Sequence, residues 1–161
     1  MSSFFYLTAF FCFLADQISK TLAARFLPPG SSVSILPNVL WFTQLHNRGA
    51  AFNLFQNQTL FLTLVGCLAV IMILWIQRKT PPSQVKTRLG LGMILGGSLG
   101  NLLDRVRFGY VVDFIDLKWW PVFNLADTLI NVGIFFIILD LLFTHSDNTK
   151  PQTQYKNSGD Y

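Results

Sequence analysis

The sequence predicts an all-α membrane protein with four transmembrane helices and a small β-rich subdomain outside the membrane. Hydrophobic residues make up 52% of the 161 residues and charged residues only 12%, which is far from the composition of an ordinary soluble domain. The apolar residues form long runs without the alternation of a barrel strand. Because lipid admits only elements that satisfy their own backbone hydrogen bonds, these runs predict a helical bundle.

The predicted spans are residues 4–26, 60–76, 89–105 and 123–143. At 1.5 Å per residue the first and last reach about 30 Å, the thickness of the hydrocarbon core, and the middle two need a few interfacial residues to cross it. The first run resembles a signal peptide in length, but no basic residue precedes it, and Asp16 and Lys20 interrupt it. We therefore expect a retained first span.

The link between the second and third spans is predicted to face the cytoplasm. It contains basic residues and no acidic residue, around a break at Pro81 and Pro82, as the positive-inside rule describes. Its basic residues are Arg78, Lys79, Lys86 and Arg88. Both termini then also face the cytoplasm. The outer links carry some basic residues too, so the charge asymmetry is moderate.

The first outer link, residues 27–59, is too long for a plain turn. Residues 32–47 within it are rich in β-branched and aromatic side chains and end close to Gly49, which predicts a small strand pair at the membrane surface. The membrane domain is expected to cover residues 1–144. Residues 145–161 are polar and nearly free of apolar side chains, which predicts a disordered cytoplasmic tail.

Several function classes are disfavoured by composition. The net charge of +4 comes from scattered Lys and Arg residues, so we expect no nucleic-acid partner. Cys12 and Cys67 lie inside apolar runs, where a thiol behaves as a small hydrophobe, and no zinc-like spacing is present. We expect neither a cofactor nor a metal.

Ionisable side chains inside a span are costly unless they are paired or hydrated. Asp16 and Lys20 are four residues apart on one face of the first helix, in the favourable order for an ion pair. The pair is either a structural tie between this helix and its neighbours or a direct contact with a ligand or the catalytic site. The sequence leaves both interpretations open.

Gly92, Gly96 and Gly100 recur every four residues along the third span. Such a stripe lets another helix backbone approach closely, so packing is the preferred interpretation. The stripe leads directly into three polar residues, Asn101, Asp104 and Arg105. A tightly packed helix would hold these polar groups rigid.

Asn124, Asp127 and Asn131 share one face of the fourth helix near its outer end. Facing lipid would be too costly, so this face must point into the bundle or into water. Taken singly, Asp127 can be an acid stabilised by the helix N-terminus. Asp113 and Asp116, taken singly, can be solvated residues of a polar loop.

Together, Asp113 and Asp127 flank the start of the fourth span and indicate a pair of carboxyl groups. Two such groups at close range share one proton near neutral pH and titrate as a unit. One acid can then deprotonate a water molecule while the other protonates the carbonyl oxygen or the leaving amine. This is the chemistry of peptide hydrolysis without a metal.

Five sequence blocks in this order resemble the blocks of the bacterial lipoprotein signal peptidase (signal peptidase II) family. They are residues 16–20 (DQISK), 47–52 (NRGAAF), 96–105 (GGSLGNLLDR), 111–115 (VVDFI) and 123–127 (FNLAD). Each block alone is a weak signal, but five in order across four spans are specific. The stretch after Asp116 looks short for the family, and the tail has no counterpart in it.

The resemblance implies an aspartyl endopeptidase of the bacterial inner membrane that acts near the outer leaflet. It would remove signal peptides from diacylglyceryl-modified prolipoproteins, N-terminal to the lipidated cysteine, with Asp113 and Asp127 as the catalytic pair. The matching site-supporting positions are Asp16, Lys20, Asn47, Asn101, Asp104, Arg105 and Asn124. The expected partners are the prolipoprotein and membrane lipid, and the chain is expected to be a monomer.

Two rival classes remain open from sequence. A small transporter or proton relay also carries buried acids, but a relay would spread them through the membrane depth, and no internal repeat is visible. A purely structural scaffold would leave the polar face of Asn124, Asp127 and Asn131 unexplained.

Overall fold

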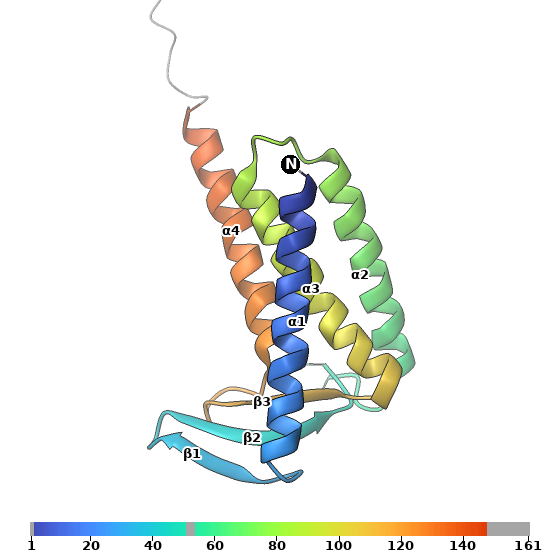
Figure 1. Ribbon diagram of the computed structural model, residues 1–161, viewed down its shortest axis with the longest axis vertical. Helices are drawn as coiled ribbons and strands as arrows, with labels where there is room; N and C mark the ends of the chain where they lie inside the picture. Colours follow the sequence, from blue (N-terminus) through green and yellow to red (C-terminus); the bar gives the residue numbers. More distant parts are fainter. Residues whose placement is uncertain (1, 51–53, 148–161) are drawn as a thin grey trace, which may run out of the picture.

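The computed structural model describes residues 2–50 and 54–147, which form four helices and a three-stranded sheet. The helices are α1 (Ser2–Phe26), α2 (Thr59–Lys79), α3 (Val85–Phe108) and α4 (Leu125–Asp147). The strands are β1 (Ser32–Leu36), β2 (Leu40–Asn47) and β3 (Val111–Asp116). The helices run side by side as a bundle, and the sheet lies across one end of it (Figure 1). Most of the predicted disordered tail, from residue 148 onward, lies outside the described residues.

Helix α3 contacts each of the other three helices. Its predicted glycine stripe faces α1: a Cβ built on Gly96 would lie 2.6 Å from the carbonyl oxygen of Ala9, and one built on Gly100 would collide with the carboxylate of Asp16. A second face, not expected from the sequence, meets α4, where a Cβ on Gly97 would lie 2.6 Å from the carbonyl oxygen of Ala126. Packing is therefore the correct interpretation of the stripe.

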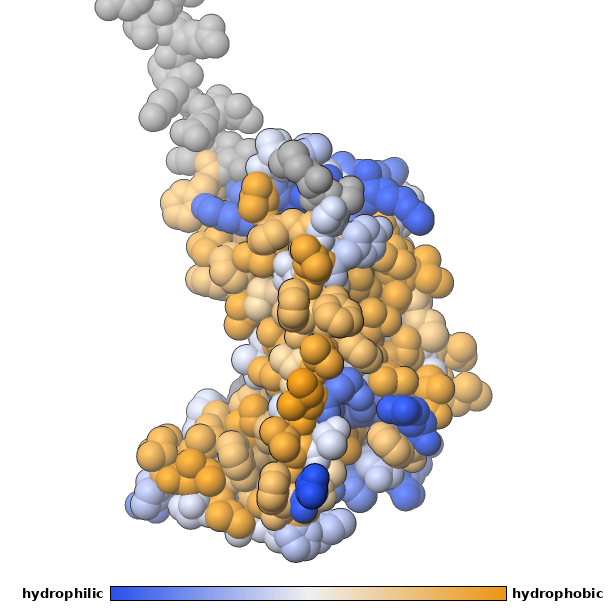
Figure 2. All heavy atoms as spheres, viewed as in Figure 1, coloured by the Kyte–Doolittle hydropathy of each residue, from blue (hydrophilic) through white to orange (hydrophobic). Residues whose placement is uncertain are grey.

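Two helical segments, Thr59–Lys79 and Leu125–Phe143, are long and apolar enough to cross a membrane. Helices α1 and α3 are not among these segments, and charged residues such as Lys20 on α1 and Asp104 on α3 lie along them. Large apolar side chains are nevertheless exposed along the bundle, among them Phe11 on α1, Leu64 on α2 and Phe135 on α4. Figure 2 shows this apolar surface, with hydrophilic residues gathered at the end of the bundle away from the sheet.

The predicted strand pair within residues 32–47 is present as the antiparallel pair β1 and β2. The sheet has a third strand that the sequence interpretation missed: β3 pairs antiparallel with β2, with Leu45 opposite Asp113. Asp113 therefore lies on a buried strand and not in a solvated loop. The run of Val, Phe and Ile around Asp113 fits a short strand that is covered on both faces.

Candidate active site

The chain between β3 and α4 turns back on itself and brings Asp113 and Asp127 to one place. Phe123 pairs with Ile115: the backbone N–H of Phe123 donates to the Ile115 carbonyl at 3.0 Å, and the Phe123 carbonyl accepts from Ile115 at 2.8 Å. This bridge sets Asn124 beside β3. Helix α4 begins at the next residue and carries Asp127 in its first turn.

Asp113 is 2% exposed, and two amides bind its carboxyl group. Asn124 Nδ2 donates to Asp113 Oδ1 at 2.6 Å, and Asn47 Nδ2 donates to Asp113 Oδ2 at 2.8 Å. Asn47 lies on β2, diagonally across from Asp113 on the same face of the sheet. Burial first and then the nearby Asp127 carboxylate raise the pKa of Asp113 to about 7, although the hydrogen bonds from the two amides act in the opposite direction.

Asp127 is held by a reciprocal cap at the start of α4. The Asp127 N–H donates to Asn124 Oδ1 at 3.0 Å, and the Asn124 N–H donates to Asp127 Oδ2 at 3.2 Å. This is the arrangement of a capping box, in which two backbone donors at a helix start are satisfied together. Asn101 on α3 adds a third contact, since its Nδ2 donates to Asp127 Oδ1 at 2.9 Å.

A buried ion cluster lies behind the two aspartates. Lys20 Nζ lies 2.9 Å from Asp16 Oδ2 and 3.0 Å from Asp104 Oδ2. Asp16 Oδ1 also accepts the backbone N–H of Ala126 at 3.0 Å, and Asp104 Oδ2 accepts that of Val112 at 3.3 Å. The cluster thus ties α1 to α3, α4 and β3. Of the two interpretations of the Asp16–Lys20 pair, the geometry favours the structural tie.

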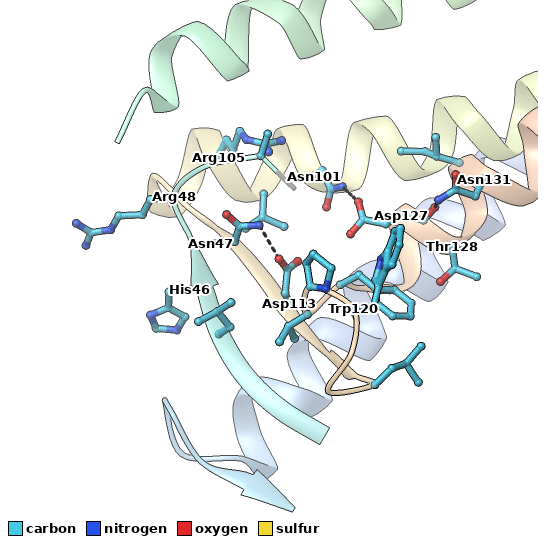
Figure 3. Close-up of a pocket in the computed structure, with 18 of the residues that line it drawn as sticks. His46, Asn47, Arg48, Asn101, Arg105, Asp113, Trp120, Asp127, Thr128 and Asn131 are labelled. Carbon is cyan, nitrogen blue, oxygen red and sulfur yellow. Dashed lines mark hydrogen bonds between the residues drawn. The ribbon is translucent and has the colours of Figure 1, made fainter. Parts of the chain in front are cut away.

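A cavity of about 1050 Å³ opens between the sheet, α3 and α4. Both Asp113 and Asp127 point into it, and Asn101 lies above them (Figure 3). Arg105 also lines the cavity and comes within 3.4 Å of the carbonyl oxygen of Gly49. Of the predicted site residues, five line this cavity: Asn47, Asn101, Arg105, Asp113 and Asp127. The other four do not line the cavity. Asn124 and Lys20 bind residues that line it, and Asp16 and Asp104 bind Lys20.

Asp116 has a different environment. It is 5% exposed and accepts hydrogen bonds from Thr43 Oγ1 at 2.7 Å and from Lys118 Nζ at 2.7 Å. Burial alone would raise the pKa of Asp116, but its bonds to Lys118 and Thr43 outweigh burial and hold that pKa below its usual value. The expectation of a solvated loop position was therefore wrong, and Asp116 does not line the cavity.

Sequence reasoning gave no site role to Gln17 or Asn131. Gln17 Nε2 lies 3.1 Å from Asp16 Oδ2 and 3.2 Å from Asp104 Oδ1, so it bridges two buried acids. Its position next to an acid inside a long apolar run was the available signal. Asn131 was assigned to the polar face of the fourth helix, and it lines the cavity one turn beyond Asp127.

No group of three or more His, Cys, Asp or Glu side chains within residues 2–50 and 54–147 is placed to hold a metal ion. The fold and the cavity place the chain among helical membrane proteins that carry a polar site at one end of an apolar bundle. Comparison with known proteins shows which family within this class the chain belongs to.

A family model described as Signal peptidase (SPase) II matches residues 8–143. The lipoprotein signal peptidase of Moorella thermoacetica is 44% identical over 138 residues, which cover 86% of this chain and 92% of that protein. The lipoprotein signal peptidase of Coxiella burnetii is 43% identical over 142 residues, 83% of this chain and 86% of that protein. A solved structure described as a bacterial membrane enzyme is similar with a TM-score of 0.84 and 29% identity, covering 92% of this chain and 93% of that one.

The chain therefore belongs to the signal peptidase II family. Membership of this family makes it a peptidase, and its apolar helices agree with an integral membrane protein.

Proposed function

We propose that the protein is an aspartyl endopeptidase of the bacterial inner membrane that cleaves signal peptides from diacylglyceryl-modified prolipoproteins. The cut lies on the N-terminal side of the lipidated cysteine. The family and the lipoprotein signal peptidases among its relatives support the substrate class. The observation that carries the mechanism is that Asp113 and Asp127 face one cavity while the pKa of Asp113 lies near 7.

In this mechanism the two carboxyl groups hold one proton between them. The ionised group takes a proton from a water molecule as the water oxygen attacks the scissile carbonyl carbon. The protonated group then gives its proton to the leaving amine as the carbon–nitrogen bond breaks. The products are a signal peptide with a new carboxylate and a lipidated cysteine with a free amine.

The surrounding amides hold the pair in position for this proton exchange. Asn47, Asn101 and Asn124 each donate to one of the two carboxyl groups, so neither side chain is free to rotate away. Arg105 lines the same cavity and interacts electrostatically with both acids. Its cation can stabilise the negative charge that develops on the carbonyl oxygen during attack.

The proposed topology has all four helices crossing the membrane, with both termini in the cytoplasm. The basic link between α2 and α3 lies at the end of the bundle opposite the sheet (Figure 1), as the positive-inside rule requires for a cytoplasmic link. The cavity then lies near the outer leaflet, where a lipid-anchored substrate presents its scissile bond. We propose that the chain acts there as a monomer.

The test is cleavage of a synthetic prolipoprotein peptide by the purified protein in detergent micelles. The matched control is the same peptide with an unmodified cysteine. We expect the diacylglyceryl peptide to be cut once, with the lipidated cysteine as the new N-terminus by mass spectrometry, and the control to stay intact. Cleavage of neither peptide, or cleavage at another bond, would overturn the proposal.

A further inference from the structure

Asn131 is a primary amide on the apolar part of α4. It lies within Leu125–Phe143, the segment apolar enough to cross a membrane, between Ile130 and Val132. Its side chain is exposed and lines the cavity that contains Asp127 (Figure 3). An amide that faces hydrocarbon without a partner is costly. Any polar partner that Asn131 finds beyond its own helix must therefore lie in the cavity.

The hydrogen-bonding capacity of Asn131 is only partly used. Nδ2 donates one N–H to the backbone carbonyl of Asp127 at 2.9 Å. An asparagine amide has two N–H donors and a carbonyl acceptor. Among the described residues, the Asp127 carbonyl is the one partner found for the Asn131 side chain. A second N–H therefore remains to be donated into the cavity.

We propose that Asn131 donates this second N–H to an ester carbonyl of the diacylglyceryl group on the substrate. This inference rests on the proposed function. An ester offers acceptors and no donors, so the spare N–H is the group that matches it. The inference gives Asn131 a role in selecting the lipid part of the substrate, separate from the chemistry at Asp113 and Asp127.

The spacing along α4 fits this contact. Asn131 lies four residues beyond Asp127, about 6 Å further along the helix axis at 1.5 Å per residue. In a diacylglyceryl cysteine, the nearer ester carbonyl oxygen is about seven bonds from the Cα atom. A chain that spans about 3.3–3.6 Å for every three bonds reaches up to about 8 Å over that distance, which is enough to cover the separation along the helix. When Asp127 acts on the scissile bond, the ester can reach Asn131, and the acyl chains continue past Ile130.

The test compares two synthetic substrates that differ only in the lipid linkage. One carries the diacylglyceryl group, and the other carries a dialkylglyceryl ether, which keeps the linking oxygen atoms and the chain lengths but lacks the carbonyl groups. The measured quantity is the ratio of kcat/KM for the ester to kcat/KM for the ether. Within one protein variant, this ratio cancels any change in the amount of folded enzyme.

The variants are Asn131→Leu, which has a similar size but no donor, and Asn131→Ser. The serine hydroxyl has a single O–H, which would bond the Asp127 carbonyl and leave no donor for the ester. The control is Thr63→Val on α2, because Thr63 Oγ1 donates to the Thr59 carbonyl at 2.7 Å in the same local pattern but does not line the cavity.

We expect wild type and Thr63→Val to favour the ester by about three- to tenfold, the effect of one neutral hydrogen bond. Asn131→Leu and Asn131→Ser should bring the ratio close to one by losing activity on the ester alone. Should Asn131→Leu not fold, Asn131→Ser and the wild-type ratio decide the question. Equal losses on both substrates, or a wild-type ratio near one, would overturn this inference and leave the proposed function intact. A wild-type enzyme that cuts neither substrate would refute both.

Discussion

Lys20 on α1 donates a hydrogen bond to Asn101 on α3 with 2.8 Å between Lys20 Nζ and Asn101 Oδ1. The same Asn101 side chain donates to Asp127 Oδ1 at 2.9 Å. One amide therefore connects the buried ion cluster with one of the two candidate catalytic acids. The position of Asp127 depends on a charge that is located on another helix.

Lys20→Met is expected to destabilise the protein and to reduce its activity. The methionine keeps much of the volume, but Asp16 and Asp104 would lose the cation that both of them contact. Removing one partner of a buried ion pair typically costs about 3–5 kcal/mol. The free energy of unfolding in mixed micelles measures this loss. The control is Lys86→Met, since within residues 2–50 and 54–147 the contact found for the Lys86 side chain is a cation–π contact with Phe143 at 5.2 Å. Equal stability of the two variants would show that the cluster contributes little.

Asp113→Asn is expected to change how stability depends on pH. The folded state raises the pKa of Asp113 from 3.8 to about 7, so between these values it retains a proton that the unfolded state releases. The free energy of unfolding of the wild type should therefore fall as pH rises through this window and level off above about pH 7. The total fall is at most about 4–5 kcal/mol, at roughly 1.4 kcal/mol per pKa unit. Denaturant titrations from pH 4 to 8 measure it.

The asparagine variant cannot titrate at this position and should lack that slope. At pH 8, Asp113→Asn is expected to be more stable than the wild type. Asp116→Asn should show the opposite sign at pH 8, because bonds from Lys118 and Thr43 stabilise the Asp116 carboxylate. If Asp113→Asn kept the wild-type slope, burial of an ionising Asp113 would not be its cause.

Gly100→Ala is expected to damage catalysis more than membrane insertion. A Cβ at this position would collide with the Asp16 carboxylate, so either that carboxylate must leave its buried ion pair or α1 and α3 must move apart. A shift of about 1 Å at a preorganised site can cost roughly a hundredfold in rate. Turnover and membrane yield measure the two effects. The control is Gly66→Ala on α2, where a Cβ would meet Leu102 at an ordinary 3.4 Å. Unchanged turnover of Gly100→Ala would contradict the tight contact.

The proposed orientation can be tested by chemical labelling. In a chain with Cys12 and Cys67 replaced by alanine, Gln84→Cys lies in the basic link between α2 and α3, and Ser34→Cys lies on β1. With a membrane-impermeant thiol reagent, Ser34→Cys should react in intact cells, and Gln84→Cys only after the inner membrane is opened. The reverse pattern would put the cavity in the cytoplasm and remove its access to an exported substrate.

The apolar runs and the turn residues were sufficient to predict the bundle and the strand pair. The ion pair between Asp16 and Lys20 could also be predicted, since four-residue spacing places two side chains on one helix face. These predictions depend on local periodicity. The contacts that join α1 to Asp104 and Ala126 are made between residues 84 to 110 positions apart in sequence, and no local pattern contains them.

Strand β3 shows most clearly what local sequence patterns could not predict. Asp113 and Asp116 interrupt a short apolar run, so the segment was interpreted as a polar loop. Its structure depends on pairing with β2 and on the bridge between Ile115 and Phe123. Both aspartates are buried because distant partners, Asn47 for Asp113 and Thr43 for Asp116, satisfy them.

In the proposed mechanism Asp113 and Asp127 together perform the hydrolysis, and cleavage of a diacylglyceryl prolipoprotein peptide by single variants tests this directly. Asp113→Asn and Asp127→Asn should each fold and lose at least about a hundredfold in rate, because an amide cannot exchange the required proton. Asp116→Asn, which alters an acid outside the cavity, should keep substantial activity. Near-wild-type cleavage by Asp113→Asn or Asp127→Asn, or loss of cleavage in Asp116→Asn alone, would contradict the two-aspartate mechanism.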